Sequence, residues 1–157
     1  MNEDLGHYQS RAVRALVLIH DYSMREFLIT WKEARAQGIQ LPATDSENYR
    51  SLNHLLRHVF RSSGKYITGV CERLELPNPR IPPAPEPGVI AANADRYLED
   101  LLAHWRLPLV GVKDADTEPE VYVPGMHYWV DAMLEHAAFH PIHHQFQLKE
   151  LMQQQSS

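Results

Sequence analysis

The chain carries a single cysteine, Cys71, among its 157 residues. One cysteine cannot form an internal disulfide, and this fits a reducing compartment, so we expect the cytoplasm. No apolar run approaches the roughly 20 residues that a helix needs to span a bilayer. The N-terminus, Met1–Leu5, is acidic and polar, unlike a signal peptide. We therefore expect no membrane association.

Basic runs and alternating apolar patterns are also absent. The formal net charge is −5 and no stripe of lysine and arginine occurs, which argues against nucleic acid as a partner. The lack of period-2 alternation argues against a sheet of any size. A chain of 157 residues with 44% apolar residues is long enough for one domain with a real core. We expect a single domain over residues 1–157.

Apolar residues recur at helical spacing in four segments, which predicts helices over residues 4–37, 44–74, 89–105 and 125–153. Gly38 ends the first, and Thr44 with Glu47 resembles a capping box that opens the second. Six of the twelve residues 77–88 are proline, so this stretch cannot be helical. The sequence predicts an all-α four-helix bundle, with a long proline-rich crossover between its second and third helices. Residues 107–124 are expected to be irregular, with a short extended piece over 120–123.

Histidine is the abundant residue, with four copies in the nine residues 136–144. His136, His140 and His144 recur every four residues, which places their imidazoles on one face of a helix. An i, i+4 pair offers two nitrogen ligands to one metal ion. The pair His140 and His144 suits chelation best, whereas His136 is placed to extend the ladder or orient a ligand. His143 lies on the shoulder, as an alternative ligand.

This face of the last helix is expected to point into the core. Projection at about 100° per residue puts the three histidines on one stripe with a set of larger side chains: Trp129, Met133, Gln147 and Leu151. Pro141 interrupts the hydrogen bonds of the same helix. It predicts either a kink beside the histidines or a gentle bend around the core.

A third ligand must come from another helix, and the second helix offers His54 and His58. His54 projects onto the face that carries Arg61 and Lys65, whereas His58 lies at the edge of the apolar stripe beside small residues. The projection favours His58 without excluding His54. The isolated histidines are expected to be exposed or hydrogen-bonded structural residues: His7, His20, His104 and His127. Cys71 is expected to be a buried, inert thiol, and Asp21 a paired or solvated surface carboxylate.

Two segments resemble the DinB-like superfamily, which includes YfiT-type metalloenzymes. Residues 140–148, His-Pro-Ile-His-His-Gln-Phe-Gln-Leu, match its last-helix pattern of His, two variable residues, His-His and then Gln-Leu. Residues 51–59 resemble its second-helix pattern, in which a leucine and one variable residue precede a ligand histidine, here His58. Where the family often has Arg-Gly after the paired histidines, this chain has Gln145-Phe146.

The resemblance covers essentially the whole chain in helix order. It implies an up-down-down-up bundle, a divalent metal ion held by His58, His140 and His144, and frequently a homodimer. It also implies an enzyme, either a hydrolase or a transferase of a low-molecular-weight thiol, without identifying the substrate. Imidazole ligands suit Zn²⁺ or Ni²⁺, and such a metal ion activates bound water.

Two other functions remain open from the residues. A non-catalytic metal-binding or stress-associated bundle would close the site with a fourth protein ligand, for which His54, His136 and His143 are candidates. A metal-free dimer would use the histidines for hydrogen bonds alone.

Overall fold

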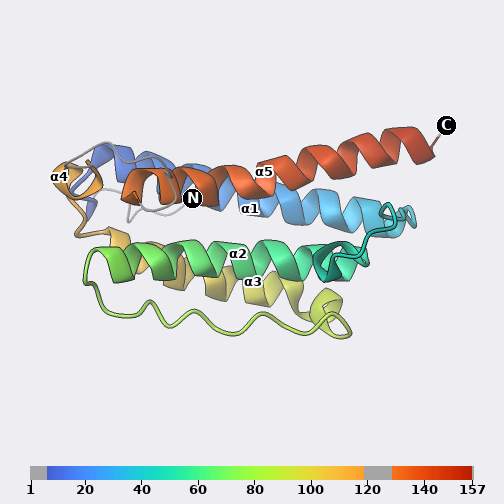
Figure 1. The fold of residues 1–157 in the computed structure, drawn as a ribbon, viewed down its shortest axis with the longest axis horizontal. Helices are drawn as coiled ribbons and strands as arrows, with labels where there is room; N and C mark the ends of the chain where they lie inside the picture. The colour runs from blue at the N-terminus through green and yellow to red at the C-terminus, as the bar shows by residue number, and fades with distance from the viewer. Residues whose placement is uncertain (1–6, 119–128, 157) are drawn as a thin grey trace.

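The computed structural model describes residues 7–118 and 129–156, and within these ranges it contains helices and no strands. Four long helices pack together (Figure 1): α1 (Arg11–Ala36), α2 (Leu52–Arg73), α3 (Ile90–Arg106) and α5 (Val130–Gln155). Three short elements lie in the connections: η2 (Glu47–Tyr49), η3 (Leu107–Leu109) and α4 (Asp114–Thr117). The predicted all-α four-helix bundle is confirmed. In the part of the chain that is described, no helix combines the length and apolarity needed to cross a bilayer.

The helices follow the predicted up-down-down-up order. Figure 1 shows α1 and α5 running in one direction and α2 and α3 in the other. Because α2 and α3 are parallel, the connection between them must return along the whole bundle, and the proline-rich segment does so in extended form. Backbone carbonyl groups of this segment accept hydrogen bonds from side chains of α3. The Tyr97 hydroxyl donates to Pro82 O at 2.7 Å, and His104 Nδ1 donates to Pro79 O at 3.1 Å. His104 is therefore a hydrogen-bonded structural residue, as predicted.

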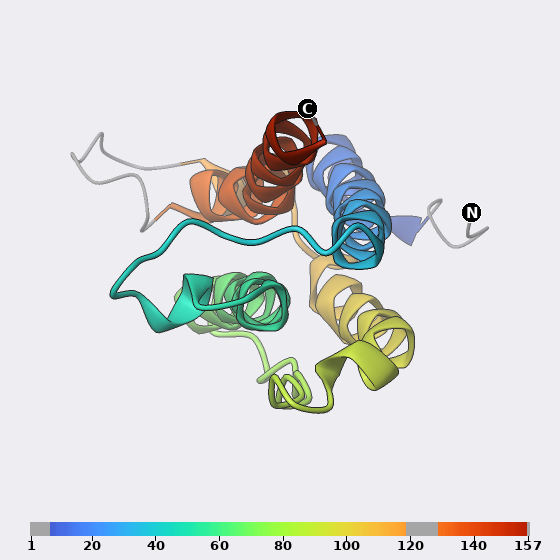
Figure 2. The ribbon, with the colours of Figure 1, turned by 90° about the vertical axis from the view of Figure 1, so that its right-hand side faces the viewer.

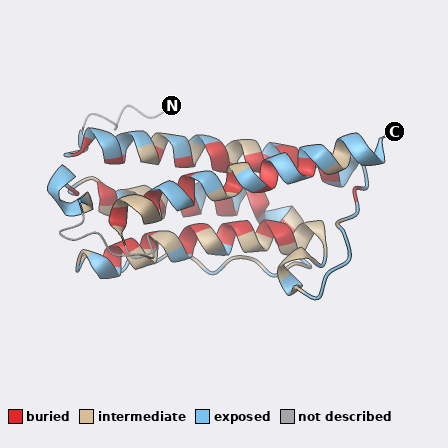
Figure 3. Cartoon of the chain, turned by 45° about the horizontal axis from the view of Figure 1, so that its top comes forward, coloured by how far each residue is buried: buried red, intermediate tan, exposed pale blue. Residues whose placement is uncertain are grey.

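The core consists of two clusters of buried side chains along the bundle axis, on the inward faces of the helices (Figure 3). One is centred on Phe27, Trp31 and Phe60, and the other on Trp105 and Leu134. The most extensive packing joins α1 and α5. In α1, α2 and α3, most of the buried apolar residues recur at the helical spacing that predicted these helices.

Two helix starts differ from the prediction. Helix α1 begins at Arg11, after Ser10 caps it by accepting from Val13 N at 3.1 Å. Helix α2 begins at Leu52 with Ser51 as its cap, so the predicted start at Thr44 is wrong. The Thr44 hydroxyl instead accepts from Ser46 N at 3.2 Å, a local turn that competes with helix capping.

The later boundaries agree within a few residues, with α5 beginning at Val130. The predicted extended piece over 120–123 and His127 lie outside the described residues.

Candidate metal centre

The structure brings His58 of α2 together with His140 and His144 of α5. His140 Nε2 lies 3.2 Å from His58 Nε2 and 3.3 Å from His144 Nε2. One ring nitrogen from each residue can be chosen so that all three lie within 4.8 Å of one another. The rings meet at steep angles, between 66° and 84°, so they converge edge-on and do not stack. This His58–His140–His144 cluster could hold a metal ion.

The cluster is held in its neutral form. Burial, together with the neighbouring imidazoles, lowers the pKa of His140 to about 3. Burial and the neighbouring imidazoles also lower the pKa of His144 to about 4, against the hydrogen bond with Gln147, which raises it. Burial also lowers the pKa of His58, with a smaller contribution from the positive charges of Lys65 and Arg61. A neutral imidazole keeps a nitrogen lone pair that can bind a metal ion.

The proton on His144 is placed by Gln147. His144 Nδ1 lies 2.8 Å from Gln147 Oε1. A carbonyl oxygen can only accept, so Nδ1 carries the hydrogen and Nε2 presents its lone pair to the cluster. Metal-binding histidines usually donate their second ring N–H to an oxygen in this way. Gln147 is therefore placed to fix both the tautomer and the orientation of the His144 ring.

The facing nitrogens have too few protons to satisfy one another. His140 Nε2 faces two other Nε2 atoms, and a single N–H cannot make a full hydrogen bond to both. The lone pair of His144 already points inward. A cation among three neutral imidazoles would use all of these lone pairs at once, and imidazole nitrogen is a preferred ligand of Zn²⁺, Ni²⁺ and Cu²⁺. The residues present therefore fit a divalent transition metal.

The other candidate histidines lie outside the cluster. His54 sits at the start of α2, where its Nδ1 is 2.8 Å from Ser51 Oγ. His143 is exposed, and its Nε2 accepts from Gln147 Nε2 at 3.1 Å. His136 is exposed, with its ring centroid 5.7 Å from that of Tyr66. Over residues 7–118 and 129–156, the cluster thus has three members, and His58 rather than His54 is the one from α2.

The buried face of α5 is not the one predicted. His140 and three of the larger residues of the predicted stripe are half-buried, while His136 and Gln147 are exposed. The centre of the buried face lies roughly 100° around the helix axis from His140. This face includes two alanines and a proline among its eight buried residues: Val130, Leu134, Ala137, Ala138, Pro141, His144, Gln145 and Leu148. It faces α1, where Gln145 Nε2 donates to Thr30 Oγ1 at 3.1 Å.

This rotation explains why the cluster lies where α5 meets α2, and why His58 and His140 are only half-buried. Ala137, Ala138 and Pro141 are buried on that face, and His140 and His144 meet His58 on the flank of α5 that faces α2. Helix α5 continues through Pro141, which is itself buried. Gln145 is a buried structural residue.

Sequence reasoning missed Tyr49. Its ring centroid lies 5.6 Å from that of His58 and 5.9 Å from that of His144, so it packs against two members of the cluster. It sits on η2, in a connection without periodicity, so no pattern in the sequence indicated it. The contact of Gln147 with His144 could have been expected from their i, i+3 spacing.

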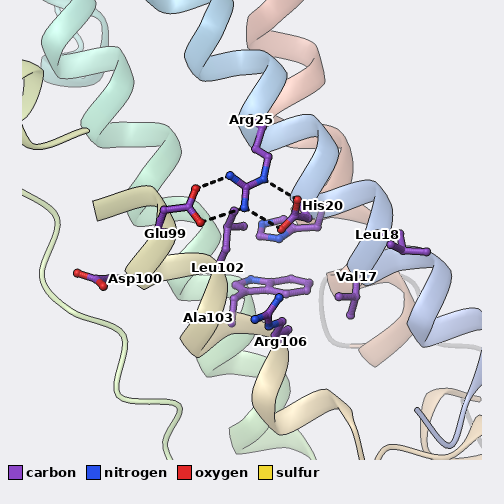
Figure 4. Close-up of a pocket in the computed structure, with 11 residues that line it drawn as sticks. Val17, Leu18, His20, Arg25, Glu99, Asp100, Leu102, Ala103 and Arg106 are labelled. Atoms are coloured by element: carbon purple, nitrogen blue, oxygen red, sulfur yellow. Dashed lines mark hydrogen bonds and ion pairs between the residues drawn. The ribbon is translucent and has the colours of Figure 1, made fainter. Parts of the chain in front are cut away.

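A cavity of about 460 Å³ lies between α1 and α3 (Figure 4). The cluster lies instead between α2 and α5, the other pair of helices (Figure 2). At the rim of the cavity, Arg25 is held by both Asp21 and Glu99. These charges satisfy one another, so we assign this cavity no ligand. Asp21 is paired, as predicted.

The floor of this cavity contains His20. Its ring stacks on Trp105 at 3.8 Å between centroids, and its Nε2 lies 2.8 Å from Ser63 Oγ. Burial lowers the pKa of His20 to about 3, so the ring is neutral. His20 is a hydrogen-bonded core residue, as predicted. Cys71 is buried as well, and burial raises the pKa of its thiol, which matches the predicted inert side chain.

Comparison with known proteins does not add a family to this geometry. No family model matches the chain, and no curated protein or solved structure is significantly similar to it. The function is therefore argued from the cluster and its surroundings.

Proposed function

We propose that this protein binds one divalent metal ion, zinc or nickel, through His58, His140 and His144 and uses it as an enzyme. The observation that carries the proposal is the convergence of three neutral imidazoles whose nitrogens cannot satisfy one another. The resemblance to the DinB-like superfamily supports the same three ligands. The metal would supply Lewis-acid activation of a bound group.

The number of ligands favours a catalytic over a structural role. Structural zinc sites are usually closed by four protein ligands, whereas catalytic sites have three and keep a position open. His54 and His143, two candidates for a fourth ligand, make hydrogen bonds to Ser51 and Gln147 instead. His136 is exposed beside Tyr66. In this arrangement the three histidines bind, Gln147 orients His144, and Tyr49 shields one edge of the cluster.

Two reaction classes follow from the resemblance, hydrolysis and transfer of a low-molecular-weight thiol. The test is turnover by the zinc- or nickel-loaded protein against a panel of esters and amides and a panel of thiol-conjugation substrates. We expect turnover in one class, and its loss in His58→Ala. A metal-loaded wild type that turns over neither panel would overturn the enzyme proposal and leave a non-catalytic metal-binding bundle.

We also propose that the protein forms a homodimer through the outer surface of α1 and α5. These adjacent helices expose large apolar side chains: Ile19, Tyr22 and Ile29 on α1, and Phe139 and Phe146 on α5. An interface over these helices would remove the exposed apolar side chains from water, which is favourable.

Sedimentation velocity is expected to show a dimer for the wild type and a monomer for the double variant Phe139→Ser, Phe146→Ser. Leu107→Ser, a change at an exposed leucine outside this surface, should leave the dimer intact. A monomeric wild type at micromolar concentration would contradict the proposal.

A further inference from the structure

Another cavity, of about 540 Å³, lies beside the His58–His140–His144 cluster, between the C-terminal half of α5 and the segment that joins α1 to α2. Its volume is within the range of small-molecule sites. Most of its lining is apolar, from six aliphatic residues: Leu41, Pro42, Ala43, Leu55, Leu148 and Leu151. Leu41 and Leu151 are only partly buried although they pack against the core, so they present apolar surface to this cavity.

The cavity and the cluster share two residues. Tyr49 lines the cavity and packs against the rings of both His58 and His144. Gln147 also lines it, and its Oε1 accepts from His144 Nδ1 at 2.8 Å. The cavity and the cluster are therefore neighbours that share part of their wall.

The wall of the cavity is held in place without a ligand. Gln40 and Gln155 exchange two hydrogen bonds, from Gln40 N to Gln155 Oε1 at 3.0 Å and from Gln155 Nε2 to Gln40 O at 2.8 Å. Ile39, directly before Gln40, is 5% exposed and belongs to the core. These contacts tie the joining segment to the end of α5. A preformed apolar site loses little binding energy to rearrangement.

Charge distinguishes this cavity from two others in the bundle. The α1–α3 cavity is lined by Arg25, Arg106 and three carboxylates, and a cavity of about 720 Å³ beside α2 is lined by Arg57, Arg61 and Lys65 with two glutamates. The cavity beside the cluster has one charged lining residue, Glu150. Burying an unpaired charge there would be costly, and Glu150 would repel an anion.

We propose that this cavity binds the uncharged, apolar part of a small substrate whose polar group lies at the His58–His140–His144 cluster. The inference rests on the proposed metal function, because the metal would hold the polar group. It names the substrate class as an amphipathic small molecule, with a metal-binding head and an aliphatic or aromatic tail.

The test uses zinc-loaded protein and linear alkyl hydroxamates, from acetohydroxamate to octanohydroxamate, with affinities measured by calorimetry. The hydroxamate head binds the metal while the chain length varies. Each methylene that enters an apolar site is expected to raise affinity about fourfold, until the cavity is filled.

Ala43→Trp provides the matched variant, since Ala43 is exposed yet lines the cavity, so a larger side chain fills it without entering the core. This variant should lose the dependence on chain length while keeping wild-type affinity for zinc and acetohydroxamate. Leu151→Gln should weaken the dependence by making the wall polar. Ala92→Trp, at an exposed alanine of α3, serves as the control and should behave as wild type.

The outcomes separate the two proposals. If the protein bound zinc but the zinc-loaded protein bound short and long hydroxamates equally well, the cavity inference would be overturned and the metal function would stand. The same would follow if chain-length dependence persisted in Ala43→Trp. A wild type that binds no zinc would overturn the metal function, and with it the inference.

Discussion

A His144→Ala variant is expected to bind zinc between about 100-fold and 1000-fold more weakly than the wild type. His144 is the most buried member of the cluster, 2% exposed, and its proton is fixed on Nδ1 by Gln147. Its loss would remove one of three ligands and expose the other two imidazoles to water. Competition against a chromophoric chelator at pH 7.5 measures the affinity.

Two further variants separate the loss of a metal ligand from an unspecific effect of substitutions in α5. Gln147→Leu removes the acceptor of the His144 Nδ1–H but leaves all three ligands, so a loss of about 10- to 100-fold is expected. His136→Ala changes an exposed histidine on the same helix outside the cluster and should bind zinc as the wild type does. If His136→Ala were as weak as His144→Ala, the assignment of ligands would be wrong.

Acidification is expected to destabilise the metal-free protein through His20. The pKa of His20 is about 3 in the folded protein, below the ordinary value of 6.5 that it regains on unfolding. At any pH between these values the unfolded chain binds the extra proton, so unfolding is favoured as pH falls. The stability contributed by neutral His20 is complete above pH 6.5 and is lost on descent toward pH 3. The loss amounts to on the order of 4 kcal/mol.

The measurement is the free energy of unfolding in urea at several pH values, with a chelator present. His20→Gln cannot titrate in this range and should show a flatter dependence on pH than the wild type. Ser63→Ala removes the hydrogen-bond partner but keeps the buried imidazole, so it should retain the wild-type dependence even though its overall stability falls. Parallel curves for the wild type and His20→Gln would show that His20 is not buried in its neutral form.

Much of the fold followed from periodicity and from proline. Long apolar repeats gave the four main helices, and the run of prolines over 77–88 identified the connection that parallel helices require. The start of α2 was missed because Thr44, Ser46 and Ser51 are all good capping residues. Only the tertiary structure decides that Thr44 closes a turn and that Ser51 caps the helix.

The candidate site was predictable in part. The i, i+4 spacing of His140 and His144 brings those two together on any helix, and the edge position of His58 favoured it over His54. The direction in which they point was not predictable from hydropathy, because the buried face of α5 includes Ala137, Ala138 and Pro141, which are not strongly apolar. Tyr49 comes to the cluster through tertiary folding, from a connection that carries no periodic signal.

The most direct test of the account is the metal content of purified, untagged protein, determined by elemental analysis for the wild type and for His58→Ala and His144→Ala. The cluster predicts close to one equivalent of zinc or nickel in the wild type and little in either variant, with all three proteins remaining helical by circular dichroism. A wild type that is free of metal and takes up none when zinc or nickel is added would contradict the account. The three histidines would then serve hydrogen bonding between α2 and α5 alone.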